Sequence, residues 1–235
     1  MVDFRNDNRI AEGMKAQLLS RQKAISDGAK PIGWKVGFGA RAMLDRLNLE
    51  KPLVGFLTDR GRVPSGETVS LAGWVKPVAE PEIAVHIGSD LASGGEAAVR
   101  AAIKAIGPAI ELADLDPPPD DVAKALAGNI YQRRVIVGPA DASRAGGKLD
   151  GIRLVVRRNG AEVANTTDLE ASTGKILAIV GHVAEVLSHF GERLKAGEFV
   201  ICGSVVPAFF LEASDNEFAY DLEPVGLISV RFGAG

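Results

Sequence analysis

The chain has 235 residues, of which 46% are hydrophobic and 24% are charged, and its formal net charge is −3. This composition is typical of a globular protein, and the length suits one large domain or one domain with a small appendage. The nearly balanced charge argues against a nucleic-acid partner, and the absence of a stretch of ~20 apolar residues argues against a membrane span. The single cysteine, Cys202, excludes an internal disulfide.

The N-terminal segment, MVDFRNDNRI, lacks the apolar run that a signal peptide requires. A lone cysteine also fits a reducing compartment. Together these features lead us to expect a cytoplasmic protein.

The first half of the chain reads as one amphipathic helix followed by mostly β structure. The helix covers residues 7–26, because Ile10, Met14 and Leu18 recur at helical spacing and Gly28 can end it. We expect strands at 32–36, 53–57, 68–71, 78–87 and 108–114, and further helices at 41–47, 94–107 and 120–127.

The second half contains a hairpin and the longest core-facing helix. Asn159-Gly160 predicts a tight turn between strands at 152–157 and 162–165, and residues 173–190 carry a helical apolar stripe. Further strands are expected at 135–137, 199–202, 216–220 and 227–232. Because strands dominate and do not alternate regularly with helices, the order favours an α+β fold with a mixed sheet or roll.

The segment at 78–87 carries the most informative pattern in the chain. In a strand, Glu80 and Glu82 point to one side, while the odd positions from Ile83 to Ile87 face a core on the other. Two adjacent carboxylates repel each other unless a positive charge lies between them, and a hard divalent cation is the natural candidate. The pattern also fits two solvated acids on an edge strand, where Pro81 would be tolerated.

A second acidic strand follows at 108–114. Glu111 and Asp114 are separated by an odd number of residues, so a regular strand sends them to opposite faces. We therefore expect one of the two, and not both, to join Glu80 and Glu82.

A glycine motif near the N-terminus suggests a different function. Gly37, Gly39 and Ala42 fit the G-x-G-x-x-A dinucleotide fingerprint, and Asp59 lies 20 residues after Gly39. Against this, Lys35 interrupts the strand, whereas buried parallel strands are almost wholly apolar. A nicotinamide-dependent oxidoreductase therefore stays open as an alternative from the residues alone.

Five motifs follow one another along the chain. They are GWKVG at 33–37, PVAEPEIA at 77–84, PAIE at 108–111, LKAGE at 194–198 with GS at 203–204, and VGLISVRF at 225–232. In order and spacing they resemble the 2-keto-4-pentenoate hydratase family of the fumarylacetoacetate hydrolase superfamily, which also includes 4-oxalocrotonate decarboxylases. The resemblance runs from about residue 10 to the C-terminus.

The resemblance implies a fold and an activity. The fold would be the mixed β-roll of the fumarylacetoacetate hydrolase C-terminal domain, with a single catalytic domain at 1–235, made of an N-terminal helical segment (1–50) and a roll (51–235). The activity would be that of a metal-dependent hydro-lyase, which hydrates 2-hydroxypenta-2,4-dienoate-type substrates to 4-hydroxy-2-oxo acids. A decarboxylase on the same scaffold is the closest alternative. Family relatives usually assemble, so a homo-oligomer is expected.

The resemblance also implies roles for particular residues. Glu80, Glu82 and Glu111 would hold one Mg²⁺ or Mn²⁺, which agrees with the preference of these cations for oxygen ligands. Lys35 would contact the carboxylate of the 2-oxo acid or move a proton, and Asp59 would be a second acid/base group. The expected substrate contacts are Ser204, Asp114 and Asn129.

The chain departs from the family around the substrate. Where many family hydratases have Pro-Asp-Phe-Gly, this chain has Leu53 in place of the aspartate, and Lys175 stands where a proline is usual. The acid that the family would use for proton transfer is therefore missing. These departures leave two alternatives open. The protein could act on a different substrate, or it could be a non-catalytic relative in which the acidic cluster only stiffens the structure.

Overall fold

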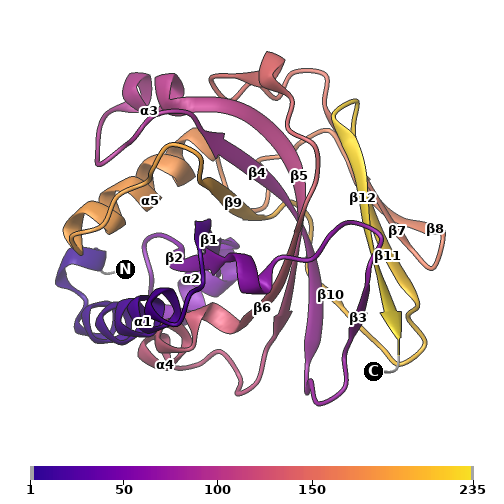
Figure 1. Ribbon diagram of the computed structural model, residues 1–235, viewed down its shortest axis with the longest axis horizontal. Helices are drawn as coiled ribbons and strands as arrows, with labels where there is room; N and C mark the ends of the chain where they lie inside the picture. The colour runs from indigo at the N-terminus through magenta and orange to yellow at the C-terminus, as the bar shows by residue number, and fades with distance from the viewer. Residues whose placement is uncertain (1–2, 234–235) are drawn as a thin grey trace.

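The computed structural model describes residues 3–233 and builds them around two β-sheets (Figure 1). In the larger sheet β1 and β9 are parallel neighbours and the other pairs are antiparallel, so the sheet is mixed, as predicted. Its strands run in the order β2 (Leu53–Thr58), β1 (Pro31–Gly37), β9 (Phe199–Ser204), β4 (Pro77–Ile87), β5 (Ile103–Asp114) and β6 (Gln132–Val137), and β10 (Phe209–Phe210) pairs with β4.

The smaller sheet contains the predicted hairpin. Asn159 and Gly160 both have positive φ, at 52° and 80°, which is the backbone of a tight I′-type turn. This sheet stands beside β5 in Figure 1. Its strands run in the order β3 (Thr68–Ser70), β12 (Gly226–Gly233), β11 (Glu217–Glu223), β7 (Arg153–Arg158) and β8 (Ala161–Thr166).

The helices lie mainly on the opposite side of the larger sheet from the smaller one (Figure 1). Within residues 3–233 no helix has the length and apolar character needed to cross a membrane. The helices are α1 (Asn8–Ser26), α2 (Arg41–Leu47), α3 (Glu96–Ala102), α4 (Val122–Ala127) and α5 (Ile176–His189), with short turns η1 (Phe4–Asn6), η2 (Asp59–Gly61), η3 (Asn129–Tyr131) and η4 (Ala142–Arg144).

The prediction of a helix at 7–26 is confirmed by α1. Asp7 caps it by accepting a hydrogen bond from the backbone N–H of Arg9 at 2.9 Å. The buried Gln17 donates to the carbonyls of Val54 (3.2 Å) and Leu126 (3.0 Å). One side chain therefore ties α1 both to β2 and to α4.

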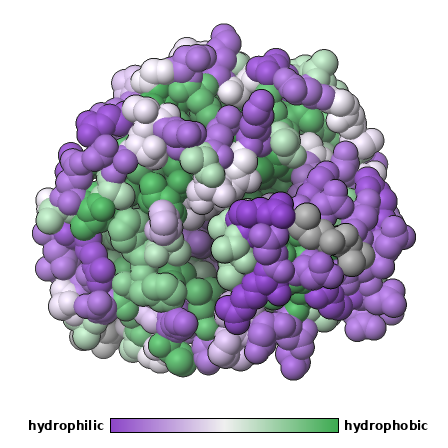
Figure 2. Space-filling model, turned by 180° about the vertical axis from the view of Figure 1, so that it is seen from behind, coloured by the Kyte–Doolittle hydropathy of each residue, from purple (hydrophilic) through white to green (hydrophobic). Residues whose placement is uncertain are grey.

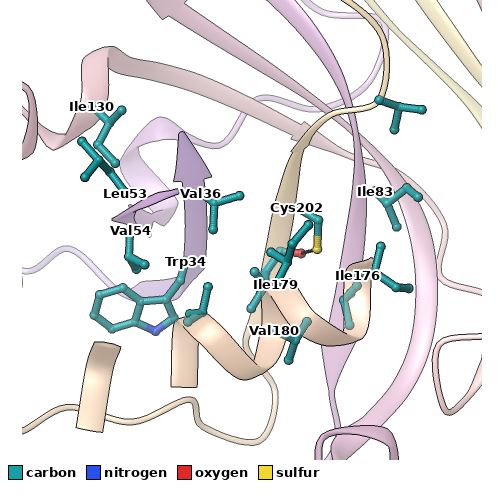
Figure 3. Close-up of a cluster of buried hydrophobic side chains, with 14 of the residues drawn as sticks. Trp34, Val36, Leu53, Val54, Ile83, Ile130, Ile176, Ile179, Val180 and Cys202 are labelled. Atoms are coloured by element: carbon teal, nitrogen blue, oxygen red, sulfur yellow. Dashed lines mark hydrogen bonds between the residues drawn. The ribbon is translucent and has the colours of Figure 1, made fainter. Parts of the chain in front are cut away.

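The main core is one continuous cluster of buried side chains, to which the larger sheet, α5 and the smaller sheet all contribute. Figure 3 shows Ile179 and Val180 of α5 beside Cys202 of β9 and Ile83 of β4. The odd positions of β4 are almost fully buried, from 1% exposed at Ile83 to 0% at Ile87. The predicted core face of this strand and the apolar stripe of the long helix are therefore confirmed.

The predicted helix at 94–107 is too long. It ends at Ala102, and β5 begins at Ile103, so the strand is correspondingly longer than predicted. Alanine favours a helix in isolation, but pairing with β4, in which His86 opposes Ala105, keeps this segment extended. Tertiary pairing thus overrides local propensity here.

The larger sheet curls back on itself. Just after β2, Arg62 forms a parallel bridge with Val135 of β6, and Val63 N donates to the Val135 carbonyl at 2.9 Å. This contact brings the two outer strands, β2 and β6, near each other. The sheet becomes a roll whose inner face carries the even-numbered side chains of β4.

Candidate active site

Three glutamates gather on the inner face of the roll. Glu80 of β4 lies directly opposite Glu111 of β5, and Glu82 is the next residue along the same face of β4. One carboxylate oxygen from each lies within 4.8 Å of the others. Glu82 and Glu111 are fully buried and Glu80 is half-buried. Because β4 is held between β9 and β5, the alternative of solvated acids on an edge strand is wrong.

Burial makes these carboxylates poor anions when no cation is present. Burial, together with the negative charge of Glu111, raises the pKa of Glu80 from its ordinary 4.5 to about 7. The same two causes raise the pKa of Glu82 well above its usual range. Burial also raises the pKa of Glu111, although the ammonium of Lys35 acts in the opposite direction.

The cluster has unsatisfied oxygen atoms. Glu82 Oε2 accepts a hydrogen bond from Gly203 N at 2.6 Å, but Glu82 Oε1 and Glu111 Oε2 are buried with no partner among the described residues. Buried polar atoms without partners are costly and usually have a functional explanation. Three carboxylates with free oxygens fit a hard divalent cation such as Mg²⁺, and they do not fit soft or nitrogen-seeking metals.

Lys35 reaches the cluster from β1. Its Nζ hydrogen-bonds to Glu111 Oε1 and donates to the backbone carbonyl of Ile130 at 3.1 Å, and its side chain is 2% exposed. Because β1 lies between β2 and β9, Lys35 does not extend to solvent from an edge strand. One ammonium thus faces three carboxylates.

An apolar floor continues the same face below the cluster. In the strand register, Glu82 opposes Ala109, Glu111 opposes Val135, and Lys35 opposes Ile201. These apolar residues form one buried group, which consists of Leu57, Ala84, Ala109, Val135, Phe199 and Ile201. The charged groups therefore rest on a dry surface, which strengthens electrostatic interactions between them.

Ser204 lies next to the cluster, and Asn129 lies beside Lys35. Ser204 opposes Glu82 in the β4–β9 register, and its hydroxyl donates to the Val206 carbonyl at 2.6 Å. The side-chain amide of Asn129 accepts from Phe56 N and donates to Phe56 O, both at 2.9 Å.

Asp114 and Asp59 lie outside the cluster. Asp114 accepts from Val75 N (3.1 Å) and Lys76 N (2.8 Å) and forms an ion pair with Arg133 at 3.3 Å. The parity argument predicted that only one of Glu111 and Asp114 would join the other glutamates, and in the structure that residue is Glu111. Asp59 sits in the exposed turn η2 after β2, where it accepts from Lys30 N at 2.9 Å.

The dinucleotide alternative does not agree with the strand directions. The fingerprint requires a strand, a helix and a second strand parallel to the first. Here α2 connects β1 to β2, and these two strands are antiparallel. The strand parallel to β1 is β9, which comes from the other end of the chain. The alternative of a Rossmann-type oxidoreductase is therefore wrong.

Two hydrogen bonds to side chains of the cluster come from backbone atoms whose role the sequence analysis did not predict. The N–H of Gly203 binds Glu82, and the carbonyl of Ile130 binds Lys35. The Gly-Ser motif indicated the first position, because Gly203 has φ of +83°, a conformation that glycine adopts readily. Nothing in the side chain of Ile130 could have indicated the second.

The comparisons with known proteins agree with this geometry. Residues 27–228 match the family model described as "Fumarylacetoacetate (FAA) hydrolase C-terminal". The chain is 29% identical over 227 residues to a 4-oxalocrotonate decarboxylase of Pseudomonas putida, covering 95% of this chain and 85% of the relative. It is 30% identical over 220 residues to a 2-hydroxyhexa-2,4-dienoate hydratase of Comamonas testosteroni, covering 88% and 80%.

A solved structure is also similar over almost the whole chain. The 4-oxalocrotonate decarboxylase from Pseudomonas putida G7, complexed with magnesium and adipate, superposes with a TM-score of 0.85 at 27% identity. The match covers 95% of this chain and 86% of that one. The curled sheet and its order of elements are thus shared with an enzyme of known structure.

Proposed function

Because this chain belongs to the fumarylacetoacetate hydrolase C-terminal family, we propose that it is a metal-dependent lyase acting on a small unsaturated 2-oxo acid. The reaction we favour is hydration of a 2-hydroxypenta-2,4-dienoate-type substrate to a 4-hydroxy-2-oxo acid. The observation that carries this proposal is the buried group of three glutamates, with Lys35 hydrogen-bonded to one of them. Relatives named as hydratases and as decarboxylases support the same class of reaction.

In this proposal Glu80, Glu82 and Glu111 hold one Mg²⁺ or Mn²⁺. Three oxygen donors leave positions open for a substrate, and the two partnerless oxygens explain why the site needs a cation. When bound, the cation supplies Lewis acidity to the 2-oxo oxygen of the substrate. The magnesium in the similar decarboxylase structure supports a divalent ion.

Lys35 is the proposed catalytic residue of the chain itself. Its buried ammonium can bind the carboxylate of a 2-oxo acid, and its Nζ is placed to hold or move a proton at the substrate. The apolar floor beneath it keeps water away from these charges. Ser204 remains a predicted substrate contact, but its one hydroxyl hydrogen is donated to the Val206 carbonyl, so it would have to release that carbonyl to donate to a substrate. The predicted roles of Asp59 and Asp114 remain predictions.

A decarboxylase is the second candidate function. Leu53 is 2% exposed on β2, where many family hydratases carry an acid, so an acidic group for hydration is missing at this position. In addition, the similar solved decarboxylase binds adipate, a dicarboxylate, together with magnesium. The missing acid weakens the case for hydration, and the bound adipate favours a substrate with two carboxylates.

One experiment separates the two reactions. The protein is incubated with Mg²⁺ and either 2-hydroxypenta-2,4-dienoate or 2-oxo-hexenedioate, while 4-hydroxy-2-oxo acid and CO₂ are measured. Hydration predicts the hydroxy acid from the first substrate without CO₂. Decarboxylation predicts CO₂ from the second. Turnover of neither compound would contradict the proposed substrate class.

We also propose that the protein is cytoplasmic and forms a homo-oligomer. Figure 2 shows hydrophobic residues gathered over one half of a face, while hydrophilic residues cover much of the other half. The described residues also include large apolar side chains that are individually exposed, such as Val75 (69%) and Leu227 (56%). Contiguous exposed apolar surface is typical of subunit contacts. Analytical ultracentrifugation tests the homo-oligomer, and a particle of only 24.7 kDa, the mass of one chain, would contradict it.

A further inference from the structure

The turn η3 has an unusual backbone. Asn129, Ile130 and Tyr131 all have positive φ, at 55°, 52° and 63°. Non-glycine residues rarely adopt this left-handed conformation, and it is least favourable for a β-branched residue such as Ile130. Such strain persists only where surrounding contacts impose it, and it clusters at functional sites.

Asn129 holds this turn against β2. Its amide oxygen accepts from Phe56 N and its amide nitrogen donates to Phe56 O, so one side chain satisfies both backbone groups of a residue on the outer strand of the sheet. On the other side, Ile130 packs against Gly37, where an added Cβ would lie 2.6 Å from Ile130 Cγ2. The turn is therefore fixed from two directions.

The result of this arrangement is the position of one carbonyl. Ile130 O accepts a hydrogen bond from Lys35 Nζ at 3.1 Å. Gly55 lies between the two side chains, and a Cβ there would lie 2.9 Å from Asn129 Oδ1 and 3.0 Å from Lys35 Cγ. Asn129 and Lys35 can thus come together because residue 55 has no side chain.

The carbonyl of Ile130 differs from the other partner of Lys35. Glu111 belongs to the carboxylate cluster, where a cation would also claim its oxygens. The Ile130 carbonyl, in contrast, accepts a hydrogen bond from Lys35 and from no other donor found among the described residues. It therefore can hold the ammonium in place whatever Glu111 binds.

We propose that Asn129 is a positioning residue, which acts through the Ile130 carbonyl to fix the Lys35 ammonium beside the three glutamates. The predicted contact of Asn129 with the substrate stays a prediction; in the structure its amide oxygen and its amide nitrogen each form a hydrogen bond with the backbone of Phe56. The inference rests on the proposed function only for its effect on turnover. The effect on Lys35 itself is independent of any activity.

The test compares three variants with the wild type. Asn129→Ala removes the contacts with Phe56 and disfavours the left-handed backbone, whereas Asn129→Gly removes the contacts but permits that backbone. Asn48→Gly is the matched control, because Asn48 is an exposed left-handed residue (φ 53°) at the end of α2, away from the cluster. Melting temperatures check that each variant folds.

The first measurement is the nitrogen-15 spectrum of labelled lysine side chains. A buried, hydrogen-bonded ammonium is protected from exchange, so Lys35 should give a resolved signal in the wild type and in Asn48→Gly. The signal should be shifted or lost in Asn129→Ala and in Asn129→Gly. An unchanged Lys35 signal in either folded Asn129 variant would overturn the proposal, even if the wild type had no lyase activity.

The second measurement is turnover of the 2-oxo acid substrate. Asn129→Ala should lower kcat by about tenfold or more, because small displacements of a catalytic group cost about that much, while KM changes less than about threefold. Asn129→Gly should lie between Asn129→Ala and the wild type. A rise in KM with unchanged kcat would instead mean that Asn129 contacts the substrate directly, and would also overturn the proposal.

Discussion

Single residues of the site carry more negative charge than the protein alone compensates. Glu82 is fully buried, yet only one of its oxygens has a partner, the N–H of Gly203. Lys35 is the one ammonium hydrogen-bonded to the cluster among residues 3–233, and it serves Glu111. This imbalance contributes to the raised pKa values of the glutamates in the metal-free protein, and under the proposed function it would be the source of affinity for a cation.

Glu82→Gln should therefore have opposite effects on metal binding and on stability. It should weaken Mg²⁺ binding, measured by calorimetry, by more than about 100-fold, since even indirect partners of a ligand cost 10–100-fold. It should also raise the free energy of unfolding of the metal-free protein at pH 8, because burial raises the pKa of Glu82 and so makes this carboxyl costly to keep in the folded state at high pH. Glu67→Gln is the control and should change neither quantity, because Glu67 is exposed and forms no ion pair with any residue in the range 3–233. Equal Mg²⁺ affinity in both variants would contradict the site.

The raised pKa values predict a pH dependence with a definite sign. Glu80 has a pKa of about 7 in the folded protein and about 4.5 when unfolded, so the folded state binds more protons between these values. Its contribution to stability therefore falls as the pH rises through this window. A cation replaces those protons, so the increase in melting temperature caused by Mg²⁺ should be larger at pH 8 than at pH 5. An increase that does not depend on pH would argue against binding at these carboxylates.

At the scale of the elements, α1 shows how a distant helix supports the site. Gln17 gives its amide hydrogens to the carbonyl of Val54, next to Gly55 on β2, and to that of Leu126 at the end of α4. The same helix ends two residues before Gly28, close to the start of β1. The strand that carries Lys35 and the segment that leads to Asn129 are thus both anchored to α1.

Gln17→Leu should destabilise the protein by about 1 kcal/mol, because two hydrogen bonds to buried carbonyls are lost while little volume changes, and removal of the partnerless Gln17 Oε1 offsets part of that cost. Urea unfolding measures this as a lower midpoint with an unchanged slope. Gln22→Leu, at an exposed position of the same helix, should change stability by less than about 0.5 kcal/mol. If the two variants unfolded at the same urea concentration, the two hydrogen bonds would not contribute as described.

The elements also differ in how well sequence predicted them. Periodicity was enough for α1 and α5, because burial of one side decides a helical pattern. Strand geometry alone was enough to put Glu80 and Glu82 on one face, because side chains alternate along a strand even when both faces are buried. The boundary between α3 and β5 was wrong, because pairing with β4 competes with the helix propensity of alanine. The left-handed turn at Asn129 had no local signal, since its contacts with Gly37 and Phe56 come from segments far away in sequence.

At the scale of the whole molecule, the roll brings together groups from four parts of the chain. Lys35 comes from β1, the first two glutamates from β4, Glu111 from β5, and the Gly203 N–H from β9. Sequence could supply the residue types and, through the resemblance, the set of ligands. Their mutual distances depend on the strand order β1-β9-β4-β5, which no local pattern contains.

We propose that this cluster of glutamates holds the divalent cation that a lyase reaction on a 2-oxo acid requires. The most direct measurement is the turnover of 2-hydroxypenta-2,4-dienoate, or of 2-oxo-hexenedioate, by protein treated with a chelator and then supplied with single metals. We predict that turnover disappears on chelation, returns with Mg²⁺ or Mn²⁺, and does not return in Glu82→Gln at the same metal concentration. Turnover that persists in the chelated protein, or that is equal in Glu82→Gln, would contradict the claim.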